Sequence, residues 1–120
     1  PDHRRWRDWM RDFAAALWNT QESVRDFSLL LISAPMGESQ VKRVERMLTT
    51  RLQALDLPVA ECLQVQGSVQ VLVTGWFIFA HSRFSAALAR RMDFRVRAMR
   101  DLEFLLEGRR PGAGRRRRRR

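Results

Sequence analysis

The sequence contains few of the residues that build metal sites and disulfides. A single cysteine, Cys62, excludes an intramolecular disulfide framework and a cysteine-cluster zinc site. The only histidines, His3 and His81, are far apart in the chain, which argues against a His-rich metal site. No carboxylate pair and no nucleophile with an accompanying base is evident. We therefore expect no catalytic activity, no metal and no cofactor.

Long apolar runs are missing too. The longest covers residues 71–80 and is interrupted by Thr74 and Gly75. Because a membrane-spanning helix needs about 20 apolar residues, the sequence predicts no such span and no membrane partner. The first residues lead into Trp6 and Asp8 rather than into an apolar stretch, so no signal peptide is expected.

Acidic residues are absent from the end of the chain, where the basic residues gather. Of 23 lysines and arginines, eight are arginines within residues 109–120. Without them 15 basic residues face 13 acidic ones, so a net charge of +10 becomes +2. Residues 1–108 are thus nearly neutral and form one predicted domain, whereas residues 109–120 are predicted to be a disordered arginine-rich tail.

Helical spacing of apolar residues dominates the predicted domain. Residues 4–18 form an amphipathic helix with an aromatic stripe. Asn19 resembles an N-cap, with Glu22 completing a capping box, so a break and a second helix to about Ile32 are expected. A Pro/Gly pair at residues 35–37 ends that helix. Residues 38–56 form the next helix, and Pro58 begins another.

Residues 59–80 fit two structures. Residues 62–73 alternate apolar and polar side chains around Gly67 and Ser68, which is a hairpin signal. The same residues place Val65, Val69 and Leu72 on one face of a helix. The helical neighbours favour a helix, since a lone two-stranded hairpin is marginally stable.

The last predicted helix follows a short loop at residues 82–85. Asp93 is a suitable N-cap and Gly108 a suitable C-terminal stop. The overall prediction is an all-α fold, an antiparallel bundle of about five helices.

Three stretches in this order resemble the C-terminal domain of TetR/AcrR-type transcriptional regulators. The first is the aromatic helix with its Pro/Gly break, residues 6–37. The second is residues 41–58, whose end RLQALDLP resembles the Leu-x-Ala-x-Gly-Leu-Pro junction of that family, with Asp56 in place of the common glycine. The third is VTGWF at residues 73–77 together with the closing helix at residues 93–108.

The resemblance implies an effector-binding and dimerisation domain in the bacterial cytoplasm. The family's helix-turn-helix domain, which contacts operator DNA, would precede the first residue of this sequence. A small effector, hydrophobic given the aromatic and methionine-rich stripes, would bind in a helical pocket. The candidate pocket residues are Trp9, Phe13, Phe27, Met47, Gln66, Gln70 and Trp76.

In this family the last two long helices of each protomer usually pair in a homodimer. The candidate interface residues are Thr74, Gly75, Ile78, Met99, Leu102 and Leu106. For each candidate, in the pocket or at the interface, ordinary core packing or surface exposure is the alternative.

Two other functions remain open at this point. The tail could bind phosphates without sequence specificity, although no aromatic residue interleaves with its arginines to stack on bases. The residues concerned are Arg115, Arg116, Arg117, Arg118, Arg119 and Arg120. A real hairpin at residues 62–73 would instead indicate an α+β interaction domain.

Overall fold

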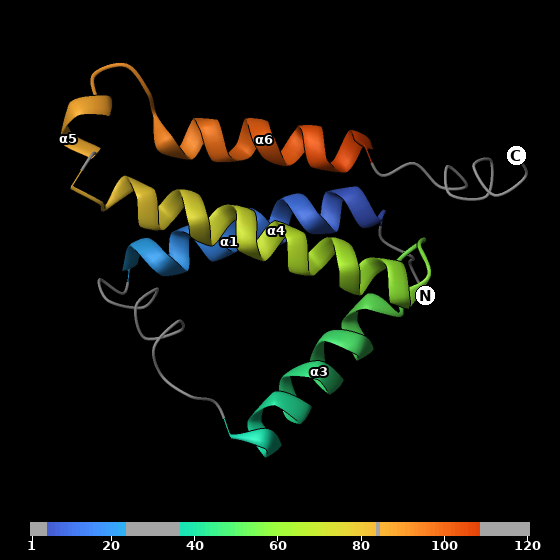
Figure 1. The fold of residues 1–120 in the computed structure, drawn as a ribbon. Helices are drawn as coiled ribbons and strands as arrows, with labels where there is room; N and C mark the ends of the chain where they lie inside the picture. Colours follow the sequence, from blue (N-terminus) through green and yellow to red (C-terminus); the bar gives the residue numbers. More distant parts are fainter. Residues whose placement is uncertain (1–4, 24–36, 84, 109–120) are drawn as a thin grey trace, which may run out of the picture.

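The structure is a computed structural model that describes residues 5–23, 37–83 and 85–108. Within these ranges the chain is all-α and contains no strand (Figure 1). This confirms the predicted fold class. The helices are α1 (Trp6–Ser23), α3 (Glu38–Leu52), α4 (Val59–Ala80), α5 (Ser85–Leu88) and α6 (Phe94–Gly108).

Three helices make the bundle, and α4 lies at its centre. It packs against both α1 and α6, running parallel to α1 and antiparallel to α6, while α3 leads away from the bundle (Figure 1). The core combines buried residues from all three helices, chiefly Trp6, Met10, Ala14, Trp18, Val65, Val69, Val73, Phe77, Ala98, Leu102 and Leu106.

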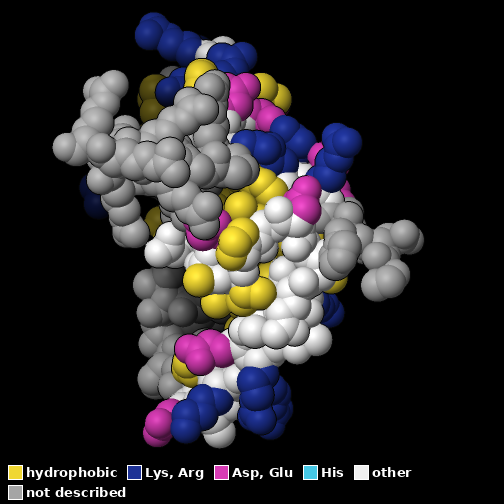
Figure 2. Space-filling model, turned by 90° about the vertical axis from the view of Figure 1, so that its right-hand side faces the viewer, with side chains coloured by type: hydrophobic (Ala, Val, Ile, Leu, Met, Phe, Trp, Pro, Cys, Tyr) yellow, Lys and Arg dark blue, Asp and Glu magenta, His cyan; other side chains and the backbone are white. Residues whose placement is uncertain are grey.

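Charged side chains of both signs surround this core. Figure 2 shows hydrophobic side chains in the middle of one face, with Lys, Arg, Asp and Glu mixed at its upper and lower ends. The mixture agrees with the near-neutral charge of residues 1–108.

The ambiguous segment is helical, so the hairpin alternative is wrong. Residues 62–73 lie inside α4, and their valines Val65, Val69 and Val73 are buried at four-residue spacing. Valine favours strands on propensity alone, but burial of this stripe between two helices outweighs a preference of a few tenths of a kcal/mol per residue.

The predicted break at Asn19 is also wrong. α1 continues through Asn19 to Ser23, because the buried stripe goes on at Trp18 and Gln21. Glu22, expected to complete a capping box, instead accepts a hydrogen bond from Trp18 Nε1 at 2.8 Å. The expected second helix, to about Ile32, falls in residues 24–36 and lies outside the described residues.

The ends of the other helices agree better with the sequence. Asp93 caps α6 as predicted, since its Oδ1 accepts the N–H of Val96 at 3.0 Å. The helix expected over residues 38–56 ends earlier, at Leu52. A short loop separates α4 from α5, as expected. The predicted arginine-rich tail lies outside the described residues.

By length and composition, α4 could cross a membrane, which the short apolar run did not predict. One such helix is weak evidence for a span, because the core helix of a bundle has the same character. In the window concerned, 33% of α4 is buried. Its contacts with α1, α3 and α6 account for that buried third, whereas apolar side chains such as Val71 are exposed.

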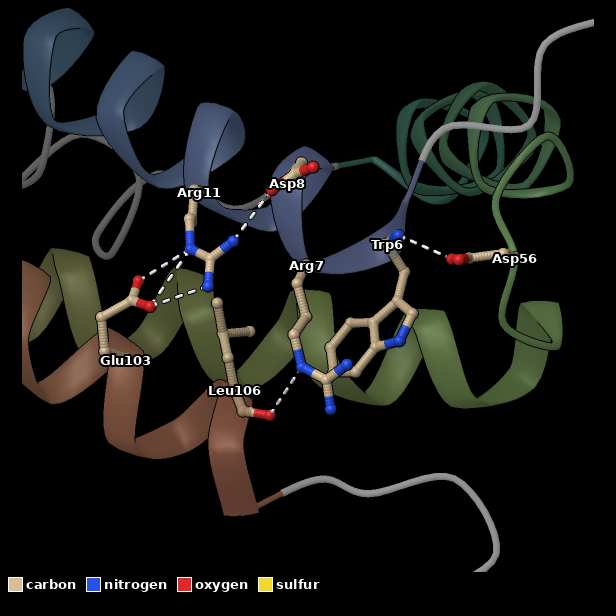
Figure 3. Close-up of polar contacts among 7 residues, drawn as sticks. All are labelled: Trp6, Arg7, Asp8, Arg11, Asp56, Glu103 and Leu106. Carbon is tan, nitrogen blue, oxygen red and sulfur yellow. Dashed lines mark hydrogen bonds and ion pairs between the residues drawn. The ribbon is translucent and has the colours of Figure 1, made fainter.

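Polar contacts fasten the beginning of α1 to two distant parts of the chain (Figure 3). Asp56, in the turn between α3 and α4, accepts the N–H of Trp6 at 2.7 Å. On α6, Glu103 forms an ion pair with the Arg11 guanidinium at 2.9 Å. The carbonyl of Leu106 accepts a hydrogen bond from Arg7 Nε at 3.3 Å. α1 is therefore fixed between the α3–α4 turn and the end of α6.

Replacing Asp56 by alanine should lower the free energy of unfolding by about 1 kcal/mol, because the first N–H of α1 loses its acceptor. Asp56→Asn keeps an acceptor oxygen and is the matched control. Urea denaturation followed by circular dichroism measures the difference. Equal midpoints for the wild-type and Asp56→Ala proteins would show that this cap contributes nothing.

The pairing of Glu103 with Arg11 should make stability depend on pH. The hydrogen bond from Arg11 lowers the pKa of Glu103, and the same bond raises the pKa of Arg11. A carboxylate with a lowered folded-state pKa stabilises the protein above its unfolded pKa. That contribution disappears as pH falls through the folded pKa. Because both side chains are nearly half exposed, it should stay within about 1 kcal/mol.

Glu103→Gln should therefore destabilise the protein at pH 7 and have little effect near pH 3, as measured by urea denaturation at both pH values. A destabilisation of the same size at both would contradict the assigned cause.

Candidate functional site

An open apolar groove follows the outer side of α4, where it lies beside α6. Its volume is about 700 Å³, and a second hollow of about 380 Å³ shares Val71 and Leu72 with it and continues toward the end of α4. The groove is lined by Leu63, Gln64, Gly67, Ser68, Val71, Leu72, Asp101 and Leu105. The continuation adds Gly75, Trp76 and Phe79.

An apolar side chain stands exposed in this groove. Val71 lines both hollows and is 75% exposed. On α6, Phe104 is 67% exposed, but it lines neither hollow. Isolated exposed apolar residues are ordinary, but a continuous apolar surface across two helices is typical of a contact site.

Two glycines keep the α4 side of the groove open. A Cβ placed on Gly67 or Gly75 would meet no other atom of the chain within 4 Å. Neither glycine is therefore needed for packing within the chain, although each costs about 1 kcal/mol inside a helix relative to alanine. The two glycines would be explained if they left room for another molecule to pack closely against α4.

The candidate interface residues separate into three groups. Gly75 and Ile78 are exposed on α4, and Gly75 lines the groove. Thr74 and Met99 are half-buried. Leu102 and Leu106 are buried in the core, so their assignment to a subunit interface is corrected. The sequence analysis missed Val71 and Phe104. Each could have been found as an apolar residue that lies off the main apolar stripe of its helix.

Trp76 does not belong with the other pocket candidates. Its Nε1 donates to Asp101 Oδ2 on α6 at 3.0 Å, and its ring packs near Phe79 and Phe94. Arg97 stands over the same ring at 5.6 Å. Trp76 therefore joins α4 to α6 and lines the continuation of the groove rather than the region of the other pocket candidates.

Trp9 and Phe13 lie on the opposite side of the bundle. Arg7 and Arg11 bond to α6, and each ring comes two positions after one of them, which in an α-helix places it on the other side of α1. The two rings stack with centroids 5.4 Å apart, and both are half-buried against the core.

Gln66 and Gln70 begin a polar row on the side of α4 that faces α1. Gln66 is 5% exposed and its Nε2 donates to Gln70 Oε1 at 2.8 Å, while Gln70 itself is exposed. The parallel course of α1 and α4 puts Gln66 about one turn from the level of Phe13 and Gln70 one turn further along. Trp9 and Phe13 thus lie on α1, and Gln66 and Gln70 on the side of α4 that faces it. Met47 lies on α3 and is 49% exposed, and Phe27 lies outside the described residues.

A buried polar contact that sequence reasoning missed continues this row. Gln21, near the end of α1, is fully buried, and its Nε2 donates to Thr74 Oγ1 at 2.9 Å. Its Oε1 has no hydrogen-bond partner among the residues that the structure describes. The sequence signal was a glutamine at a position that continues the apolar stripe of α1.

The remaining reactive side chains have structural contacts. Cys62 is buried, its Sγ donates to the carbonyl of Leu57 at 3.3 Å, and burial raises the pKa of its thiol. A thiol held protonated in this way is a poor nucleophile. His81 Nδ1 lies 2.9 Å from the carbonyl of Phe77. In the described ranges no three His, Cys, Asp or Glu side chains are grouped so that they could hold a metal ion.

Comparisons of this chain with protein-family models, with curated proteins and with solved structures found no match.

Proposed function

We propose that this chain is the regulatory domain of a TetR-type transcriptional regulator of the bacterial cytoplasm. It dimerises through the outer side of α4 and α6 and binds a small apolar effector on the α1 side of α4. Operator DNA would be contacted by a helix-turn-helix domain that is not part of this sequence. The observation that carries the proposal is the exposed apolar groove shared by the two antiparallel helices α4 and α6.

Pairing of two such surfaces gives a four-helix bundle around a two-fold axis. The open space above Gly67 and Gly75 would let the backbone of a partner helix come close. Val71 would be buried in that contact, at roughly 25 cal/mol per Å² of apolar surface removed from water. Both features lack a function in the isolated chain and gain one in a dimer.

The effector region is supported by an aromatic pair on α1 and an amide pair on α4. Trp9 stacks on Phe13, Gln66 bonds to Gln70, and none of the four lines the groove. An apolar surface with a few polar groups is typical of small-molecule sites. Since α4 contributes to both surfaces, an effector that moves α4 would also change the geometry of the dimer contact.

The alternative function, binding of nucleic acid through the arginine-rich tail, gains no support from the described residues, because Arg115–Arg120 lie outside them. It stays a proposal of second rank.

Val71→Arg should convert a dimer into a monomer, because a buried arginine without a partner charge destabilises a subunit contact. Size-exclusion chromatography with light scattering at micromolar concentration measures the mass. Val96→Arg is the matched control, since Val96 is 54% exposed on α6 but lines neither hollow.

The wild-type protein and Val96→Arg should both have the dimer mass. A monomeric wild-type protein would overturn the proposed dimer, and a dimeric Val71→Arg would move the contact away from the groove.

A further inference from the structure

The amide of Gln21 is the one polar group in the described core whose hydrogen bonding is incomplete. The side chain is fully buried, Nε2 is bonded to Thr74, and Oε1 has no partner. Buried polar atoms in folded proteins nearly always have a partner. An acceptor left free at this depth suits a hydrogen-bond donor that arrives from outside the chain.

The neighbourhood of Gln21 extends into the proposed effector region. Gln66, Gln70 and Thr74 follow one another at four-residue spacing on α4, and Thr74 bonds directly to Gln21. Because α1 and α4 run parallel, this row accompanies α1 from within about one turn of Phe13 to its last turn. The free amide oxygen therefore lies at the end of the α4 row, and on α1 it continues the four-residue spacing of Trp9, Phe13 and Leu17.

Within the described part of the chain, the residues of this surface carry no charge. Trp9, Phe13 and Leu17 supply half-buried apolar side chains, and the α4 row consists of two amides and a hydroxyl. The indole N–H of Trp18, next to Gln21 on the core side of α1, is already engaged by Glu22. A charged ligand would lose its hydration here without gaining an opposite charge.

We propose that the effector is an uncharged, mainly apolar molecule that donates one hydrogen bond, from a hydroxyl or N–H group, to Gln21 Oε1. The inference rests on the proposed function and adds the chemical class of the ligand and its polar contact. Since Gln21 has no exposed surface, the ligand reaches it only when the α1–α4 contact opens at the last turn of α1. Binding therefore shifts α1 relative to α4.

Four matched probes test the class: 4-propylphenol, propylbenzene, 4-propylanisole and 4-propylbenzoate. All four share the propylphenyl group. The phenol adds a hydrogen-bond donor, propylbenzene adds no polar group, the anisole adds an acceptor without a donor, and the benzoate adds a negative charge. Isothermal titration calorimetry on the full chain should give about 10-fold tighter binding of the phenol than of propylbenzene or the anisole, as one hydrogen bond provides. The benzoate should bind most weakly.

Gln21→Leu and Gln21→Met should abolish the preference for the phenol while propylbenzene still binds. Asn19→Leu is the matched control, because it removes an exposed amide from the same turn of α1 that takes no part in the proposed site, and it should keep the preference. The comparison among the four probes on the wild-type chain needs no variant, so it decides the ligand class even if a substitution at Gln21 prevents folding.

The outcomes separate this inference from the proposed function. Equal binding of phenol and propylbenzene, tighter binding of the anisole or of the benzoate, or a preference that survives Gln21→Leu would each overturn the inference and leave the effector site standing. Absence of binding by all four probes would overturn the inference together with the effector site. The dimer mass, measured separately, would be unaffected.

Discussion

The packing of α4 between α1 and α6 is the contact on which the rest of the structure depends. Its valine stripe at Val65, Val69 and Val73 is buried. Each of the other long described helices touches α4, and α1 and α6 contact one another far less. The outer face of α4 carries the apolar groove, and the side that faces α1 carries the polar row that leads to Gln21.

This arrangement gives the proposed regulator a short physical connection between its two surfaces. A ligand that opens the contact between α1 and α4 acts on the helix that also supplies Val71 and Gly75 to the dimer groove. The beginning of α1 is meanwhile held by Asp56 and by the end of α6. A movement at the last turn of α1 would therefore turn that helix about its fastened first turn.

Much of the fold followed from the sequence because helical spacing and local capping act over a few residues, as Asp93 shows. The prediction failed where a longer-range contact opposed a local signal. Asn19 has good capping chemistry, but the buried side chains of Trp18 and Gln21 carry α1 past it. Periodicity also shows that a side chain lies on an apolar stripe without showing which neighbour covers it. Leu102 was therefore assigned to an interface although it is core, and the exposed Val71 was overlooked.

If two copies of this chain meet along the α4 groove, thiols placed in the groove should form a disulfide between them. Cysteine cross-linking is suited to this chain because Cys62 is buried and does not compete. Ser68→Cys, Val71→Cys and Gly75→Cys each place a thiol in the groove, whereas Ser39→Cys places one on the exposed face of α3. Under mild oxidation, at least one groove variant should give a covalent dimer and Ser39→Cys should remain a single chain. Cross-linking through Ser39→Cys, with none through the groove, would contradict the account.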